Sequence, residues 1–320
     1  MAEGFNKGDM VTTEEKKLLS TQSGITRFIF FGNYFYGFCA VALSIEANLQ
    51  QHFALNKILF YVLVFACTVA YYSIAYINAG SNSHNKRLQW YHENRQFVKR
   101  SQQFFLFLIA AILLLYLQKN WQAIWLMQWH EWLIVWIFPV VAGLYYGISY
   151  KPGGKLNLRN IGWLKPFIIG FTWAGLTTAY PIIILSIESN THYAFTLIGA
   201  FLFLKNMMFV SVLCIMFDIK DYADDYNRNL KTFVTRFGLR KTIFNILLPL
   251  AVIGLGCFLV YGYLHAFSIM KIIINTLPFI AMLRVAYSLS NRHSIFYYLI
   301  IIDGLMLVKA ICGIIAVTYF

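Results

Sequence analysis

Apolar stretches long enough to cross a bilayer follow one another along nearly the whole chain, and they limit its fold more than any other feature. A transmembrane helix needs roughly 20 apolar residues to span the hydrocarbon core. Nine such segments are expected, at 27–49, 55–78, 103–119, 131–149, 162–186, 194–217, 241–264, 268–289 and 295–318. Between the third and fourth segments, Trp121, Trp125 and Trp129 suggest an interfacial helix. The sequence therefore predicts an all-α polytopic membrane protein with nine transmembrane helices in a single bundle.

Charged residues are too few for a soluble domain. They make up 12% of the chain, against about 25% in a typical soluble domain, whereas 59% of the residues are hydrophobic. Beyond the N-terminal tail, no polar stretch exceeds the length of a loop. We therefore expect a polar cytoplasmic tail over 1–26 and one transmembrane domain over 27–320. The tail lacks a small-residue cleavage site and is interpreted as a lead-in, not as a signal peptide.

Lysine and arginine are distributed unevenly between the two sides of the predicted bundle. Most of the 26 basic residues lie in the tail or in the loops after the second, fourth, sixth and eighth segments. Cytoplasmic loops carry such an excess, so the N-terminus is predicted inside and, with nine spans, the C-terminus outside. The net charge of +13 has the same origin and argues against a nucleic-acid partner. We expect a multi-pass protein of the bacterial cytoplasmic membrane, in contact with lipid; its oligomeric state is not indicated.

Four of the 13 acidic residues lie close together after the sixth segment: Asp218, Asp221, Asp224 and Asp225. If the helix continues through them, Asp218, Asp221 and Asp225 share one face and Asp224 points elsewhere. Carboxylates gathered at the mouth of a bundle repel one another unless a hard cation such as Mg²⁺ compensates them. The alternative is a solvated helix end whose charges pair with neighbouring basic residues, Lys220, Arg228 and Lys231.

The pattern D-x-x-D-x-x-x-D of these three aspartates is followed by Lys231-Thr232 and by the run RFG at 236–238. Together these residues resemble the second signature of the UbiA superfamily of intramembrane prenyltransferases. Tyr150 and Pro152, which close the fourth segment, are similar to a short tyrosine and proline element at that point in the family. The resemblance covers most of the chain, because family members also have nine helices, an inside N-terminus and two signatures after helices two and six.

The resemblance implies transfer of an isoprenyl group from an isoprenyl diphosphate to an aromatic or other lipophilic acceptor. It implies that Asp218, Asp221 and Asp225 are catalytic and ligate Mg²⁺, and that Tyr150, Lys231 and Arg236 bind substrate. The physical requirements agree with this activity. A hydrocarbon tail enters from lipid, its diphosphate must meet cations at the water boundary, and aromatic side chains, 18% of the chain, can stabilise an allylic cation.

The loop after the second segment departs from the first signature of the family. It reads NAGSNSHNK, so Asn78 is kept, while Ala79, Asn82 and Lys86 occupy the positions of three carboxylates. In one interpretation Asn78 and Asn82 supply neutral oxygens, and Lys86 with Arg87 contacts phosphate directly. In the other, the chain is a catalytically inactive relative that binds a lipid or quinone-like molecule. A scaffold and an ion-coupled transporter are the hypotheses from other classes.

A few charged residues fall within the apolar segments or near their ends. Lys205, Asp303 and Lys309 are inside segments, where charged side chains usually face the bundle interior. The sequence favours a structural pair of Lys205 with Asp303 over a proton relay. Glu46 and Glu188 lie near outer helix ends, where exposure at the interface is expected. In the loop after the Asp motif, Asn229 stands where the family has glycine, and asparagine tolerates a left-handed turn.

Overall fold

The computed structural model describes residues 24–77, 86–146, 148–151, 154–156, 158, 161–191, 193, 196–227, 229–291 and 293–320. Almost all of the described chain is helical. The first half contains α2 Gly24–Phe31, α3 Tyr34–Gln50, α4 Ile58–Ile77, α5 Lys86–Glu93, α6 Arg95–Lys119, α7 Trp121–Trp125, α8 Trp129–Tyr146, and a two-stranded antiparallel pair, β1 Ile148–Lys151 and β2 Gly154–Leu156.

The second half continues without strands among its described residues. Its elements are α9 Lys165–Ala174, η2 Gly175–Ala179, α10 Tyr180–Ser189, α11 Leu197–Lys220, α12 Tyr222–Asn227, α13 Phe233–Phe237, α14 Leu239–Thr242, η3 Ile243–Leu247, α15 Leu248–Leu264, α16 Ile269–Ser288, α17 Ile295–Tyr297, η4 Tyr298–Ile302 and α18 Gly304–Tyr319. The labels η2, η3 and η4 denote single π-helical turns inside longer helices. Proline follows two of them, at Pro181 and Pro249, and its missing N–H interrupts the normal α-helical ladder.

The prediction of a polytopic membrane protein is confirmed. Within the described residues, seven helices are long and apolar enough to cross a membrane, and α2 with α3 adds an eighth if this pair is one span bent by 60°. The bend lies at Asn33, whose φ of 66° is left-handed. Helix α8 coincides with the expected segment 131–149 but is not among the seven.

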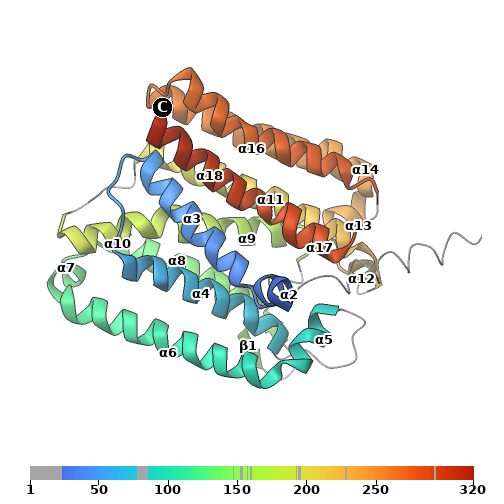
Figure 1. Cartoon of the computed structure of the whole chain (residues 1–320), viewed down its shortest axis with the longest axis horizontal. Helices are drawn as coiled ribbons and strands as arrows, with labels where there is room; N and C mark the ends of the chain where they lie inside the picture. The colour runs from blue at the N-terminus through green and yellow to red at the C-terminus, as the bar shows by residue number, and fades with distance from the viewer. Residues whose placement is uncertain are drawn as a thin grey trace, which may run out of the picture.

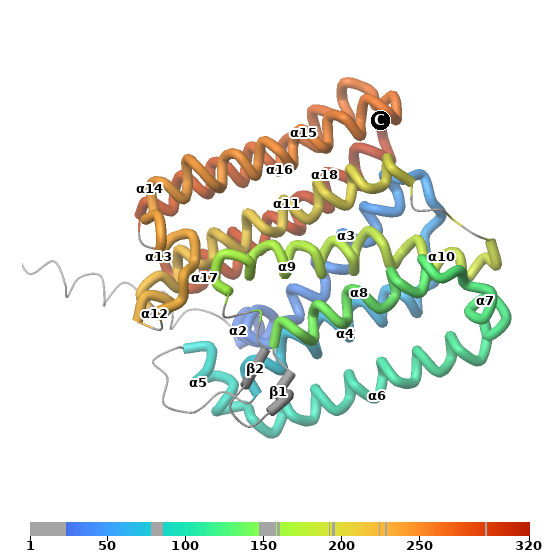
Figure 2. Tube along the Cα trace, turned by 180° about the vertical axis from the view of Figure 1, so that it is seen from behind, coloured from blue at the N-terminus to red at the C-terminus, as the bar shows by residue number. Residues whose placement is uncertain are grey.

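Helices α3, α9, α11 and α18 form the interior of the bundle. Helix α11 packs against α9 and α15, and α18 packs between α3 and α16 (Figure 1). Figure 2 shows α9 lying between α11 and α8, while α6 runs along one edge with α4 as its main neighbour. Close packing of α9 on α11 depends on Gly170, because a Cβ there would lie 2.6 Å from the carbonyl oxygen of Met207.

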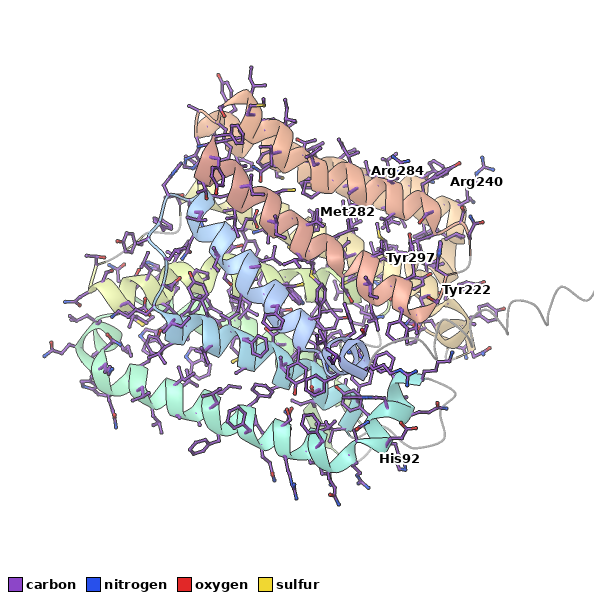
Figure 3. All side chains as sticks on the ribbon, viewed as in Figure 1. His92, Tyr222, Arg240, Met282, Arg284 and Tyr297 are labelled. Carbon is purple, nitrogen blue, oxygen red and sulfur yellow. The ribbon has the colours of Figure 1, made fainter. Side chains whose placement is uncertain are left out.

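One end of the bundle gathers α2, α5, α12, α13, α14 and α17, and we call it the basic end (Figure 1). The C-terminus and α7 lie at the opposite end. Figure 3 shows His92, Tyr222 and Arg240 at the basic end. The loops that the charge pattern assigned to the cytoplasm therefore belong to the same end of the molecule, as far as they are described.

Candidate functional site

A fully buried carboxylate, Asp218, lies in the last turn of α11 at the basic end. Its side chain is 0% exposed. Oδ1 accepts a hydrogen bond from Nζ of Lys165, the first residue of α9, at 2.5 Å. Oδ2 accepts no hydrogen bond from the residues that the structure describes. Asp218 is thus held by a lysine that belongs to neither of the two loops that correspond to the family signatures.

A tight contact between two loops brings Lys165 to this place. Gly162 lies directly on the backbone after the Asp motif, and a Cβ at this position would be 2.7 Å from the carbonyl carbon of Lys231 and 2.8 Å from N of Thr232. Only a glycine permits this approach without moving the backbone. Pro166 near the start of α9 then favours helix from Lys165 onward.

The condition for a shared face, one helix that continues through the aspartates, is not met. Helix α11 ends at Lys220, Asp221 is its C-cap, and a new helix, α12, starts at Tyr222. The side chain of Asp221 is 39% exposed and pairs with Lys220 at 3.0 Å. In contrast, Asp225 is only 7% exposed, and its charge acts on both Lys165 and Asp218. The side chain of Asp224 lies outside the described part of the chain.

Mg²⁺, the cofactor that the resemblance implies, needs several oxygen ligands around one point. Among the described residues, no three His, Cys, Asp or Glu side chains are arranged to hold a metal ion. Lys165 occupies Oδ1 of Asp218, and Asp221 pairs with Lys220. The motif does not form a ready Mg²⁺ site in this arrangement, and metal ligation by its three aspartates stays a prediction.

The residues after the Asp motif form a capped turn with exposed cations. Lys231 and Arg236 are both exposed at the basic end. Thr232 caps α13 by accepting a hydrogen bond from N of Thr235. Asn229 has a φ of 55°, which confirms the left-handed turn expected there. Two cations therefore remain accessible beside the buried aspartates, as a phosphate-binding site requires.

Most of the degenerate first loop lies outside the described residues. Asn78 and Asn82 lie outside the described residues, as does the side chain of Tyr150. Lys86 is described and exposed. The roles of these four residues in substrate binding stay predictions.

Arg87 is buried, and its guanidinium is engaged by the bend between α2 and α3. It donates to the carbonyl oxygens of Phe30 and Phe31 at 3.3 Å and to the side-chain oxygen of Asn33, and it lies 4.3 Å from the ring centroid of Tyr76. These contacts satisfy the carbonyls that the helix break leaves without partners. Contact between Arg87 and phosphate, as the sequence suggested, would compete with them.

Several aromatic side chains pack together in the bundle interior. Tyr36 and Tyr72 stack at 4.7 Å between ring centroids, and Nε1 of Trp173 donates to the hydroxyl of Tyr72 at 2.7 Å. Cys214, one helical turn before Asp218 on α11, belongs to the same packed cluster. We call Tyr36, Tyr72 and Trp173 the aromatic wall.

Comparison with protein-family models, with curated proteins and with solved structures found no match. The resemblance to the UbiA superfamily therefore rests on the motif residues of this chain alone.

The expected pair of Lys205 with Asp303 is not formed. Asp303 is buried and accepts a hydrogen bond from the hydroxyl of Tyr36 at 2.7 Å. Lys205 instead donates to Glu46 at 3.1 Å, and Lys309 donates to the other oxygen of Glu46 at 2.5 Å. Glu46 is 0% exposed, so its expected exposure at the interface is also wrong. Its position near a helix end could not reveal that two lysines from other spans face it.

Sequence reasoning counted Lys165 only as a basic loop residue and missed its contact with the motif. The available signal was Pro166. Proline is favoured in the first turn of a helix, which places Lys165 at the start of the fifth span, at the same end as Asp218.

Proposed function

We propose that the chain is a UbiA-type prenyltransferase, which transfers an isoprenyl group from an isoprenyl diphosphate to an aromatic or other lipophilic acceptor in the membrane. One observation carries the proposal: Asp218 is a buried carboxylate at the basic end, and Cys214, one helical turn earlier on α11, packs in the same cluster as the aromatic wall. The diphosphate would lie at the basic end beside Lys231 and Arg236. The isoprenyl group would extend toward the aromatic rings.

The chemistry of isoprenyl transfer fits these two environments. Loss of diphosphate leaves an allylic cation, which the π faces of Tyr36, Tyr72 and Trp173 would stabilise. The departing diphosphate carries several negative charges and needs cationic side chains at the water boundary. Burial excludes water from the cation and so favours alkylation of the acceptor over hydrolysis.

The proposed topology has nine spans, with α8 and the bent pair α2 and α3 completing the set. The basic end and the N-terminus would face the cytoplasm of a bacterial cell, because most lysines and arginines lie there. Single cysteines introduced at Lys241 and at Tyr319, on a background without the native cysteines, test this orientation. A membrane-impermeant maleimide added to intact cells should label only the second position.

The activity is tested with purified protein in lipid nanodiscs and a panel of isoprenyl diphosphates of increasing chain length. The assay measures pyrophosphate release with Mg²⁺ and with EDTA, because the described aspartates do not form a ready metal site. Asp218→Asn should abolish release, whereas Glu93→Gln, an exposed acid at the same end, should leave it unchanged. Absence of release under every condition would reject the transferase.

The second candidate function is an inactive relative that binds a lipid or quinone-like molecule. The pairing of Lys165 with Asp218 favours this inactive relative, because Lys165 must be displaced before a metal ion can bind Oδ1 of Asp218. Such a protein would gain thermal stability from its ligand without releasing pyrophosphate.

A further inference from the structure

A lysine ammonium occupies the place beside Asp218 where a metal ion would otherwise be expected. We propose that Lys165 is a built-in cation of this site, and that the site binds a diphosphate headgroup without a metal ion. The identity of the ligand rests on the proposed function. The role of Lys165 rests on its own geometry.

The charges of the motif are already compensated to a large extent. A fully buried carboxylate is costly unless it is paired, and Lys165 provides this pairing at 2.5 Å from Oδ1 of Asp218. Lys220 pairs with the partly exposed Asp221 at 3.0 Å. A divalent ion that takes Oδ1 of Asp218 would have to displace Lys165 and leave its ammonium partly buried without a carboxylate. A divalent ion at Oδ2, which accepts no hydrogen bond from the described residues, would lie beside that ammonium and be repelled by it. Metal binding is therefore opposed by an interaction that the fold already contains.

Lys165 also lies where a headgroup can reach it. Its side chain is 20% exposed, whereas that of Asp218 is 0% exposed, so solvent reaches part of the lysine side chain but not the carboxylate. An ammonium has three donors, and one of them suffices for Asp218. The other two can bind phosphate oxygens. Because Asp225 adds negative charge here, the exposed cations Lys231 and Arg236 are needed as well.

The first experiment uses a metal alone. Mn²⁺ binding to the purified protein is measured by electron paramagnetic resonance, without substrate. The wild type should show no tight Mn²⁺ site, and Lys165→Met should acquire one, because its Asp218 is released. Asp218→Asn in the Lys165→Met background should remove that site. A tight wild-type Mn²⁺ site that Asp218→Asn abolishes would overturn the proposal.

The second experiment measures binding of an isoprenyl thiodiphosphate, a donor analogue that resists ionisation. The wild type should bind it equally in EDTA and in Mg²⁺. Lys165→Met should weaken binding in EDTA by about tenfold, the effect of losing one charge-assisted hydrogen bond, and Mg²⁺ should restore it. Lys165→Arg should retain binding in EDTA. Lys241→Met, which removes an exposed lysine at the same end, is the matched control and should have no effect.

Failure of this inference can be distinguished from failure of the proposed transferase. Wild-type binding that requires Mg²⁺, or no binding in either condition, overturns the role of Lys165. Binding in EDTA without pyrophosphate release under any condition supports that role and rejects the transferase. Release that depends strictly on Mg²⁺ supports the transferase and rejects the built-in cation. Thermal stability of each variant shows whether a loss comes from misfolding.

Discussion

Lys309 and Glu46 are 263 residues apart in the sequence, and their side chains form an ion pair of 2.5 Å inside the bundle. Lys205 donates to the second oxygen of Glu46 at 3.1 Å, so two lysines share one carboxylate. The three residues come from α18, α3 and α11. A buried carboxylate paired on both oxygens joins these helices more specifically than apolar packing does, because each charge accepts only a partner of opposite sign.

Glu46→Gln should destabilise the protein by about 3–5 kcal/mol, because it removes the counter-charge of two buried lysines. The thermal midpoint in detergent is the measurement. The double change Glu46→Gln with Lys309→Met should recover part of the loss. Glu188→Gln is the matched control, since Glu188 is only partly buried. Equal losses from both single changes would show that the trio has no special role.

Arg87→Met should lower stability by about 2–3 kcal/mol, because the helix break then loses its charged donor. Lys86→Met, at the neighbouring position, is the matched control. Because the side chain of Lys86 is exposed, this change should leave the thermal midpoint unchanged. If Arg87→Met weakens diphosphate binding at unchanged stability, Arg87 is a substrate ligand and not a structural donor.

Gly162→Ala should destabilise the contact between the loop before α9 and the Asp motif by about 1–3 kcal/mol, since its Cβ would lie 2.7 Å from a backbone carbon. Gly143→Ala in α8 has no atom within 4 Å of the added Cβ and serves as the control. Thermal unfolding of both variants provides the comparison. A neutral Gly162→Ala would mean that the two loops separate readily.

Stability should fall as the pH drops below about 6.5, the ordinary pKa of histidine. Burial lowers the pKa of His265, and the neighbouring His52 lowers it further. In this pH range the unfolded chain therefore binds a proton that the folded protein does not, which favours unfolding. Thermal midpoints between pH 7 and 5 should decline less steeply in His265→Phe. Parallel pH curves for wild type and variant would contradict this linkage.

The long helices could be predicted because burial in lipid requires continuous apolar stretches, and these are visible along the chain. The interruption of the helix at Asp221 could not be predicted, because the residues around Asp221 are compatible with a helix. The end of α11 at Lys220 is visible only in the structure. The contact of Lys165 with Asp218 was equally hidden, although Pro166 indicated the end of the bundle at which Lys165 lies. Lys165 and Asp218 belong to different spans, and hydropathy does not indicate which sides of two helices pack against each other.

The sequence by itself determined that the chain is a helical membrane protein with an acidic motif at the end of one span, since hydrophobic length and residue type depend only on local composition. The tertiary structure alone decided which charges meet. It paired Asp218 with Lys165, Glu46 with Lys205 and Lys309, and Asp303 with Tyr36. These choices depend on the rotation and depth of helices that pack against each other, because a buried charge must find a partner on a neighbouring helix.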